Sequence, residues 1–262
     1  MVAVGVMLAA CNARPGAPAV SPTTGLSAAP TEGAPVAPTT PPASGSGQCA
    51  NPLLPVESGA TWRYASAANG SGASSFTIAI TGARSDGFTA SARLDDNTVI
   101  NQKWSCKPEG LALVLPGAGQ SAQRLSIGGL EANLTISNAT GVILPANIQP
   151  GMTWPYGLDL AGTLSQGSLS ANLTGNIATE FRAIGSETVN VPAGTFEAMK
   201  LQGRSTVAVT ADYHGLKLPI TSVIDTTLWF APGVGWVKST ATGEFAGTTV
   251  DAGTELQSYT IP

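Results

Sequence analysis

The chain has 262 residues, of which only 11% are charged, and 12 Lys and Arg against 16 Asp and Glu leave a net charge of −4. No basic run is present, so the sequence lacks the electrostatic footprint of a nucleic-acid-binding protein. The 31 Gly and 19 Pro, together with the lack of a sustained 3.6-residue apolar period, argue against long helices.

An apolar run from Val2 to Ala10 opens the sequence and ends at Cys11. Leu8-Ala9-Ala10-Cys11 resembles the lipobox of bacterial lipoproteins, where a Cys after small residues becomes acylated. The run is too short to span a bilayer, which needs about 20 residues. It also lacks the basic start and usual length of a signal peptide, which a start codon assigned too far downstream would explain. We predict a lipoprotein signal over 1–11 with lipidation at Cys11; the alternatives are an ordinary signal peptide with a chance Cys and a truncated hydrophobic start.

Residues 12–48 are mainly Ala, Pro, Thr, Ser and Gly, and Arg14 and Glu32 are the only charged residues among them. Because such a segment cannot bury a core, we predict a disordered, partly polyproline-like tether. At full extension its roughly 37 residues would reach about 110–130 Å. A tether of this length lifts a folded domain off a membrane surface; a plain low-complexity spacer is the alternative.

Cys49 and Cys106 are the two cysteines that remain. An exported protein meets an oxidising compartment, where disulfides form. A bridge between these two would close a loop of about 58 residues and stabilise the fold by about 4 kcal/mol in the chain-entropy model. We predict this disulfide, with two buried free thiols as the alternative. No metal site is expected, since neither Cys lies in a C-x-x-C pair and the sequence has one His.

The folded part of the sequence repeats two short signatures. G-x-T-W-x-Y occurs at 59–64 and 151–156, and a Trp followed by a Gly six positions later occurs at 104–110 and 229–235. The order is the same in both halves, so we predict two related β lobes, 49–145 and 146–262. Chance recurrence of Gly and Trp is the alternative.

Alternation of apolar residues with a period of two predicts β-strands along both lobes. In each G-x-T-W-x-Y signature the Trp and Tyr share a face, Arg63 and Pro155 point the other way, and Pro155 indicates an edge position. Further strands are expected at 76–80, 130–136, 169–173, 207–211 and 216–224, separated by turn clusters at 85–87, 95–97 and 231–233. The fold class is therefore all-β and mostly antiparallel.

The clearest hairpin runs from 185 to 202. One strand ends at Val191, the turn is Pro192-Ala193-Gly194, and the return strand begins at Thr195. Pro presets φ near about −65° and Gly allows a positive φ, so we expect the positive φ at Gly194.

This hairpin carries a resemblance. Glu187-Thr-Val-Asn-Val-Pro-Ala-Gly-Thr-Phe-Glu-Ala198 resembles the E-x-V-x-V-P-A-G-x-F-x-A hairpin of the DUF3108-like group of bacterial envelope proteins of unknown function, and Trp229-Phe-Ala-Pro-Gly-Val-Gly-Trp-Val-Lys238 is similar to the W-x-A-P-G-V-G-x-V-K strand of the same group. With the signature at 151–156, the match covers about 146–245. The resemblance implies one or more strongly curved antiparallel sheets of half-barrel or sandwich type, and it says little about activity.

The sequence offers little catalytic chemistry. A nucleophilic triad needs a base, usually His, and His214 is the single one; it lies in a predicted hairpin tip with Gly215 as the residue of positive φ. No G-x-S-x-G, S-x-x-K, H-E-x-x-H or phosphate-binding loop motif occurs. We therefore expect no enzymatic activity and no cofactor. An envelope hydrolase, with two converging carboxylates or with His214 beside a Ser, is the third hypothesis.

Large aromatic side chains are the stronger candidates for a binding site in this Gly- and Ala-rich chain. The candidate ligand-lining residues are Trp62, Trp154, Tyr156, Trp229 and Trp236. A concave face lined by them could hold an apolar ligand or a peptide, and the alternative is that they fill the core. We predict a lipid-anchored, exported binding or structural module of the bacterial cell envelope. The alternative is a carrier of a lipid or other hydrophobic molecule. The expected partners are the membrane and a hydrophobic ligand or an envelope protein, and not nucleic acid.

Overall fold

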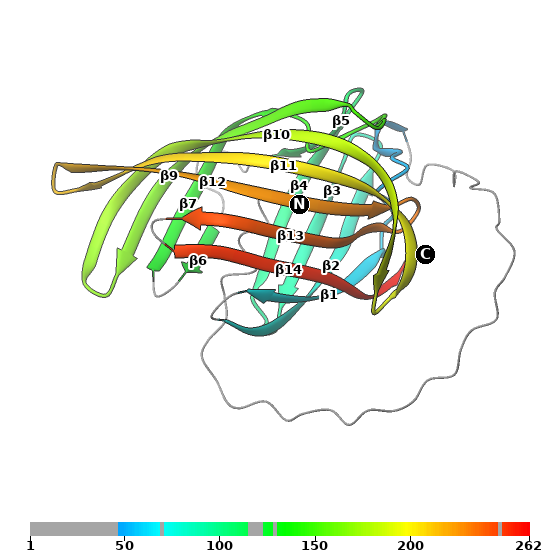
Figure 1. Ribbon diagram of the computed structural model, residues 1–262, viewed down its shortest axis with the longest axis horizontal. Coiled ribbons are helices and arrows are strands. Elements are labelled where there is room, and N and C mark those ends of the chain that lie inside the picture. Colours follow the sequence, from blue (N-terminus) through cyan, green and yellow to red (C-terminus); the bar gives the residue numbers. More distant parts are fainter. Residues whose placement is uncertain (1–46, 69–70, 115–122, 128–129, 246–247) are drawn as a thin grey trace, which may run out of the picture.

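The computed structural model describes residues 47–68, 71–114, 123–127, 130–245 and 248–262, and these form one antiparallel sheet of 14 strands (Figure 1). In chain order the strands are β1 (Thr61–Ala68), β2 (Ser71–Arg84), β3 (Gly87–Leu94), β4 (Val99–Lys107), β5 (Gly110–Val114), β6 (Gln123–Ile127), β7 (Leu130–Gly141), β8 (Leu144–Pro145), β9 (Thr153–Gln166), β10 (Leu169–Val191), β11 (Gly194–Tyr213), β12 (Leu216–Ala231), β13 (Gly235–Phe245) and β14 (Thr248–Thr260). A short 3-10 helix, η1 (Gly47–Cys49), precedes them. The predicted all-β, antiparallel fold is confirmed.

Several predictions about the N-terminal part lie outside the described residues. These are the signal over 1–11 with its lipidation site Cys11, and the tether 12–48 except for its last two residues. In the ranges that the structure describes, no helix is long and apolar enough to cross a bilayer.

The sheet is strongly curved, and its two ends approach each other without pairing. The strand order is β6-β7-β9-β10-β11-β12-β13-β14-β1-β2-β3-β4-β5-β8, so the last strand of the chain, β14, pairs with the first, β1, in the middle of the sheet. β7 ends at Gly141 near one end of this order, and β8 begins at Leu144 at the other. The Ile143 N–H donates to the Leu111 carbonyl oxygen across this point at 2.9 Å. The resulting shape is an open barrel.

The inner face of this barrel is the core, and it follows from the period-two pattern. Phe76, Ile78 and Ile80 on β2 are buried, as are Val207 and Val209 on β11. Residues directly opposed in an antiparallel pair share a face, and Ile78 opposes Trp62 of β1. The strands therefore bury one row of side chains each against the interior, as the sequence predicted.

The predicted hairpin at 185–202 is present as β10–β11. Val191 pairs with Gly194, and Pro192 and Ala193 form the two-residue loop between them. The φ of Gly194 is +141°, as expected. The return strand begins at Gly194, one residue earlier than predicted.

Pro155, predicted at an edge position, is unpaired on one side only, and β9 itself is an inner strand. β9 lies between β7 and β10 and pairs with both. The last pair between β7 and β9 joins Gly141 to Tyr156, so Pro155 lies one residue beyond the end of β7. Its missing N–H is therefore tolerated inside the sheet because no strand pairs with it on that side.

Strands from both predicted lobes belong to the same sheet. β6 and β7, from 49–145, pair on the side of β9 and β10, whereas β1 to β5 and β8 occupy the opposite half of the strand order. The two G-x-T-W-x-Y signatures both begin strands, β1 and β9, after glycines of positive φ, Gly59 at +90° and Gly151 at +87°. The division into two related lobes stays a prediction.

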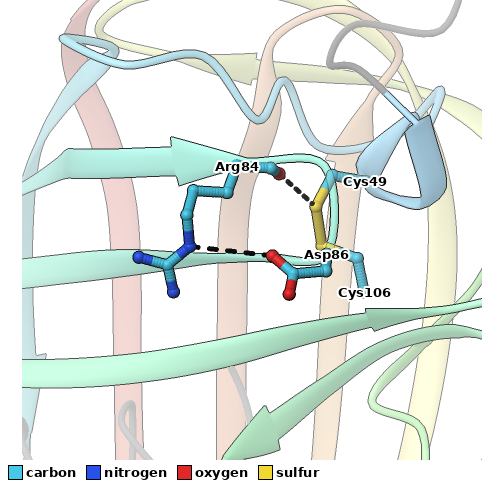
Figure 2. Close-up of a disulfide and its surroundings, with 4 residues drawn as sticks. All are labelled: Cys49, Arg84, Asp86 and Cys106. Atoms are coloured by element: carbon cyan, nitrogen blue, oxygen red, sulfur yellow. Dashed lines mark hydrogen bonds and ion pairs between the residues drawn. A yellow bond between two sulfur atoms is a disulfide. The ribbon is translucent and has the colours of Figure 1, made fainter.

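The predicted disulfide joins Cys49 and Cys106, with 4.9 Å between their Cα atoms and a sequence separation of 57 (Figure 2). Both cysteines are buried, and the bridge fastens η1 to β4. The Cys49 Sγ lies 3.2 Å from the Arg84 carbonyl oxygen. A disulfide sulfur carries no hydrogen, so this is a contact and not a hydrogen bond. The bridge holds the start of the described chain against β4 and the end of β2.

Candidate functional site

All five candidate aromatic residues are buried, but they do not form a single group. Their exposed fractions range from 2% for Tyr156 to 9% for Trp229. They occupy three places: Trp62 and Trp236 on β1 and β13, Trp154 and Tyr156 on β9, and Trp229 on β12. Whether any of them lines a ligand site stays a prediction.

The first group is a stack in which the polar atoms are satisfied. The ring of Tyr64 lies between those of Trp236 and Phe76, with centroid distances of 4.4 Å and 5.2 Å. The Tyr64 hydroxyl donates to the Trp236 carbonyl oxygen at 2.8 Å, and burial raises the pKa of this tyrosine well above its usual value. The Trp62 Nε1–H donates to the Val234 carbonyl oxygen at 2.6 Å. This geometry joins β1 to β13 and to the turn before it.

The second group, on β9, carries unpaired polar atoms. The Trp154 ring stacks on Phe181 with 5.5 Å between centroids. Among the described residues, the Trp154 Nε1 and the Tyr156 hydroxyl have no hydrogen-bond partner although both are buried. Burial raises the pKa of Tyr156 to about 12, so the phenol is neutral and can donate a proton to a hydrogen bond.

Other polar side chains share the inner face with Tyr156. Tyr156 opposes Thr179, and Thr179 opposes Ser205, whose hydroxyl lies 2.8 Å from that of Thr179. Across the barrel, the Ser66 and Thr254 hydroxyls lie 3.1 Å apart. Besides Trp154 Nε1 and the Tyr156 hydroxyl, the buried side-chain atoms without a partner in the described part of the chain are Gln102 Oε1, Trp104 Nε1, Thr226 Oγ1 and Ser239 Oγ. Sequence reasoning missed this polar component of the interior, although Ser and Thr at alternate positions of apolar strands were a visible signal.

Trp229 lies apart from the other candidates, on the outer face of the sheet. It opposes Lys200, and its Nε1–H donates to Glu187 Oε1 at 2.7 Å. Lys200 forms an ion pair with the same carboxylate at 3.2 Å and places its Nζ 5.4 Å from the Trp229 ring centroid. The hydrogen bond from Trp229, followed by Lys200, lowers the pKa of Glu187. The three side chains hold β10, β11 and β12 together near the Pro192-Ala193 turn.

A hollow of about 760 Å³ opens on the outer face of β9, β10, β11 and β12. Its lining includes Pro155, Glu180, Arg182, Arg204 and Asp225. The Arg204 Nη1 lies 2.9 Å and 3.0 Å from the two Asp225 carboxylate oxygens. Within the described residues, neither Arg182 nor Glu180 takes part in an ion pair. The hollow therefore offers one free cation and one free anion to a polar ligand; Tyr156 is the only candidate aromatic residue in its lining.

His214 lies at the exposed tip of the β11–β12 hairpin, as predicted. Tyr213 pairs with Leu216, His214 and Gly215 form the two-residue loop, and their φ values are +51° and +89°. The His214 ring makes an edge contact with the Tyr213 ring at 4.6 Å. The described part of the chain contains no group of three or more His, Cys, Asp or Glu side chains that could hold a metal ion.

Solved structures similar to this chain come from bacterial proteins. A Bacteroides fragilis protein that is thought to be exported and has a YmcC-like fold is 12% identical, with a TM-score of 0.47 over 84% of this chain and 100% of that one. A Parabacteroides distasonis protein thought to be a lipoprotein is 14% identical, with a TM-score of 0.43 over 80% and 99%. The hypothetical lipoprotein YmcC from Escherichia coli is 11% identical, with a TM-score of 0.37 over 78% and 85%. No family model and no curated protein matches the sequence, so the resemblance to the DUF3108-like group is not confirmed.

Proposed function

We propose that this chain is an exported module of the bacterial cell envelope, anchored to a membrane through acylated Cys11 and acting by binding rather than by catalysis. The anchor, the tether over 12–48 and the barrel that begins at the disulfide would form one functional unit. The tether would hold the barrel close to the bilayer while leaving it free to meet a partner.

The disulfide is the observation that carries the extracytoplasmic location. Disulfides persist in oxidising compartments and are rare in the cytosol, where thiols are kept reduced. Cys49 and Cys106 lie 57 residues apart in sequence, and the fold brings their Cα atoms to 4.9 Å. The bridge begins where the predicted tether ends, which suits a domain that must stay folded outside the cell.

The binding role is supported by the hollow on the outer face. Arg182 and Glu180 lie two residues apart on β10, so they project from the same face, and both are exposed. They can meet a ligand that carries both charges or several hydroxyl groups, because Arg donates and the carboxylate accepts hydrogen bonds. A hollow of about 760 Å³ is within the size range of small-molecule sites.

A carrier of hydrophobic molecules is the second candidate. It is favoured by the inner face, where aromatic rings lie beside polar atoms that have no partner among the described residues, such as the Tyr156 hydroxyl and the Trp154 Nε1. An apolar lining with a few polar groups is the usual composition of a ligand site. Mass spectrometry of organic extracts from the purified protein separates the two candidates: a co-purified lipid in stoichiometric amount supports the carrier, and its absence supports the binding module.

The anchor is tested in cells that express the chain with a complete signal sequence. Globomycin, which blocks the lipoprotein signal peptidase, should cause a larger precursor to accumulate, and labelled palmitate should enter the wild type but not Cys11→Ser. The wild type should fractionate with membranes, and Cys11→Ser should be released. A product of unchanged size under globomycin, with no label, would refute the lipid anchor.

A further inference from the structure

The β11–β12 hairpin extends beyond the rest of the sheet. β12 starts at Leu216, but its pairing with β13 begins only at Ile224. Among the described strands, residues 216–223 of β12 therefore pair with β11 alone. Figure 1 shows this hairpin projecting past the ends of β13 and β14. We call it the overhang, defined as residues 209–223.

The inner face of the overhang continues the apolar interior into solvent. Val209 opposes Ile220, Ala211 opposes Leu218, and Tyr213 opposes Leu216. Exposure rises along this ladder from 4% at Val209 to 49% at Leu218 and 60% at Leu216, with 37% at Tyr213. The same row of side chains thus passes from a buried core to an open surface.

The neighbouring hairpin adds a fourth apolar side chain at the same place. Leu169, at the start of β10, is 54% exposed, and its row on β10 runs through Ala171 to Leu173, which opposes Ala211. Leu169, Tyr213, Leu216 and Leu218 make up half of the eight large exposed apolar side chains in the described part of the chain. They gather on one face at one end of the barrel, whereas Val99, Val114, Ile184 and Tyr259 lie on other strands.

The open edge of the overhang is unsuited to pairing with another strand. Pro219 lies in the middle of it and has no N–H to donate to an added strand. Lys217 places a positive charge on the opposite face, beside Pro219, which also discourages edge-to-edge pairing. A partner would therefore meet the apolar face and not the edge.

We propose that this apolar face docks on the surface of the lipid bilayer that holds the anchor, so that the barrel lies against the membrane through its hairpin tips. The inference rests on the proposed function, because acylated Cys11 would fix one end of the chain in that bilayer. About 35 residues separate Cys11 from Gly47, and fully extended they reach about 115–125 Å, enough for the tips to return to the membrane. Leucines bury in the acyl boundary, and tyrosine suits the headgroup level.

The test places a reporter in the overhang of the full-length chain. The acylated Tyr213→Trp variant and the acylated wild type are each reconstituted into vesicles of phosphatidylethanolamine and phosphatidylglycerol. Their Trp fluorescence is compared with and without phospholipids brominated on their acyl chains, which quench Trp that lies in the bilayer. Because the native Trp side chains are buried, we expect extra quenching in the variant over wild type. Adding Leu216→Ser and Leu218→Ser should abolish that extra quenching. The matched control, Val99→Ser with Tyr259→Ser, removes two exposed apolar side chains elsewhere and should leave it unchanged.

A second arm separates failure of the anchor from failure of the docking face. The double variant Cys11→Ser, Tyr213→Trp is not acylated, and at high lipid concentration its hairpin tips should still bind the same vesicles. Replacing Leu216 and Leu218 by Ser in this variant should lower the apparent affinity about tenfold. Intact mass reports the acyl group independently. Equal quenching of variant and wild type in acylated protein would overturn the docking proposal and leave the anchor intact. A concentration-dependent dimer that loses stability with the two Leu→Ser changes would overturn it in favour of a second copy of the chain.

Discussion

The disulfide between Cys49 and Cys106 allows the sharpest stability prediction. Replacing both by Ala removes a cross-link between residues 57 apart in sequence. In the chain-entropy model a loop of this length restricts the unfolded chain by about 4 kcal/mol. The two side chains are buried, but Ala fills most of the space of a Cys, so the packing loss is small beside the entropy term. We expect the free energy of unfolding to fall by about 3–4 kcal/mol.

Urea unfolding followed by Trp fluorescence measures this loss, and the native state should keep its far-UV spectrum. For a fold of this size the melting temperature should fall by about 6–16 °C. Cys11→Ser is the matched control, since it removes a Cys without touching the bridge and should leave the midpoint unchanged. Reduction of the wild type should reproduce the double variant. Equal midpoints for wild type, reduced protein and double variant would show that the bridge does not constrain the unfolded chain.

Three further predictions concern the hairpins and the aromatic groups. Gly194→Val should destabilise the fold by about 1–3 kcal/mol, because a β-branched residue must adopt the φ of +141°; an unchanged urea midpoint would count against the turn assignment. Tyr64→Phe should cost about 1–2 kcal/mol, since it leaves the buried Trp236 carbonyl oxygen unpaired, and calorimetry measures it. Trp229→Phe should raise the pKa of Glu187 toward its ordinary value, as followed by carboxyl NMR. Because the folded pKa is lowered, the stability linked to Glu187 is present above its unfolded pKa and is lost as pH falls through the folded value; the variant should show a smaller loss, since Lys200 still lowers the pKa of Glu187.

Period-two alternation predicted strands in β1, β2, β7 and β9–β12 and the inward face of several of them, but it did not predict β3–β6 or β14. Trp62 and Tyr64, two residues apart, are both buried, while Arg63 between them is exposed. The same rule failed at Trp229. Leu228, Trp229, Phe230 and Ala231 are all apolar and all buried, so β12 buries side chains on both faces near the turn. A run of apolar residues with no polar member does not show which side chains point inward. The outward position of Trp229 therefore follows only from its pairing with Lys200.

The outer hollow could not be predicted from the sequence for a different reason. Glu180, Arg204 and Asp225 lie on three strands, and only the register of β10, β11 and β12 places them side by side. A one-residue shift in the register of any of these strands would turn that strand's side chain from the outer face to the interior. Register depends on turn lengths and on irregularities in strand pairing. One such irregularity is the register shift between Ala183 and Gly185, which no local sequence pattern predicts. Sites made by long-range strand pairing are therefore harder to predict than the strands themselves.

Strand length explains why one end of the barrel differs from the other. β10, β11 and β12 have 23, 20 and 16 residues, and β13 has 11. The excess length cannot be covered by the shorter neighbour, so Leu216 and Leu218 stay in water at a free-energy cost that grows with their exposed area. Pro219 limits pairing along the open edge but does nothing for the exposed face. A bilayer held within reach by the tether would remove that cost without any change in the fold, and it would do so only if the leucines, and not the edge, make the contact.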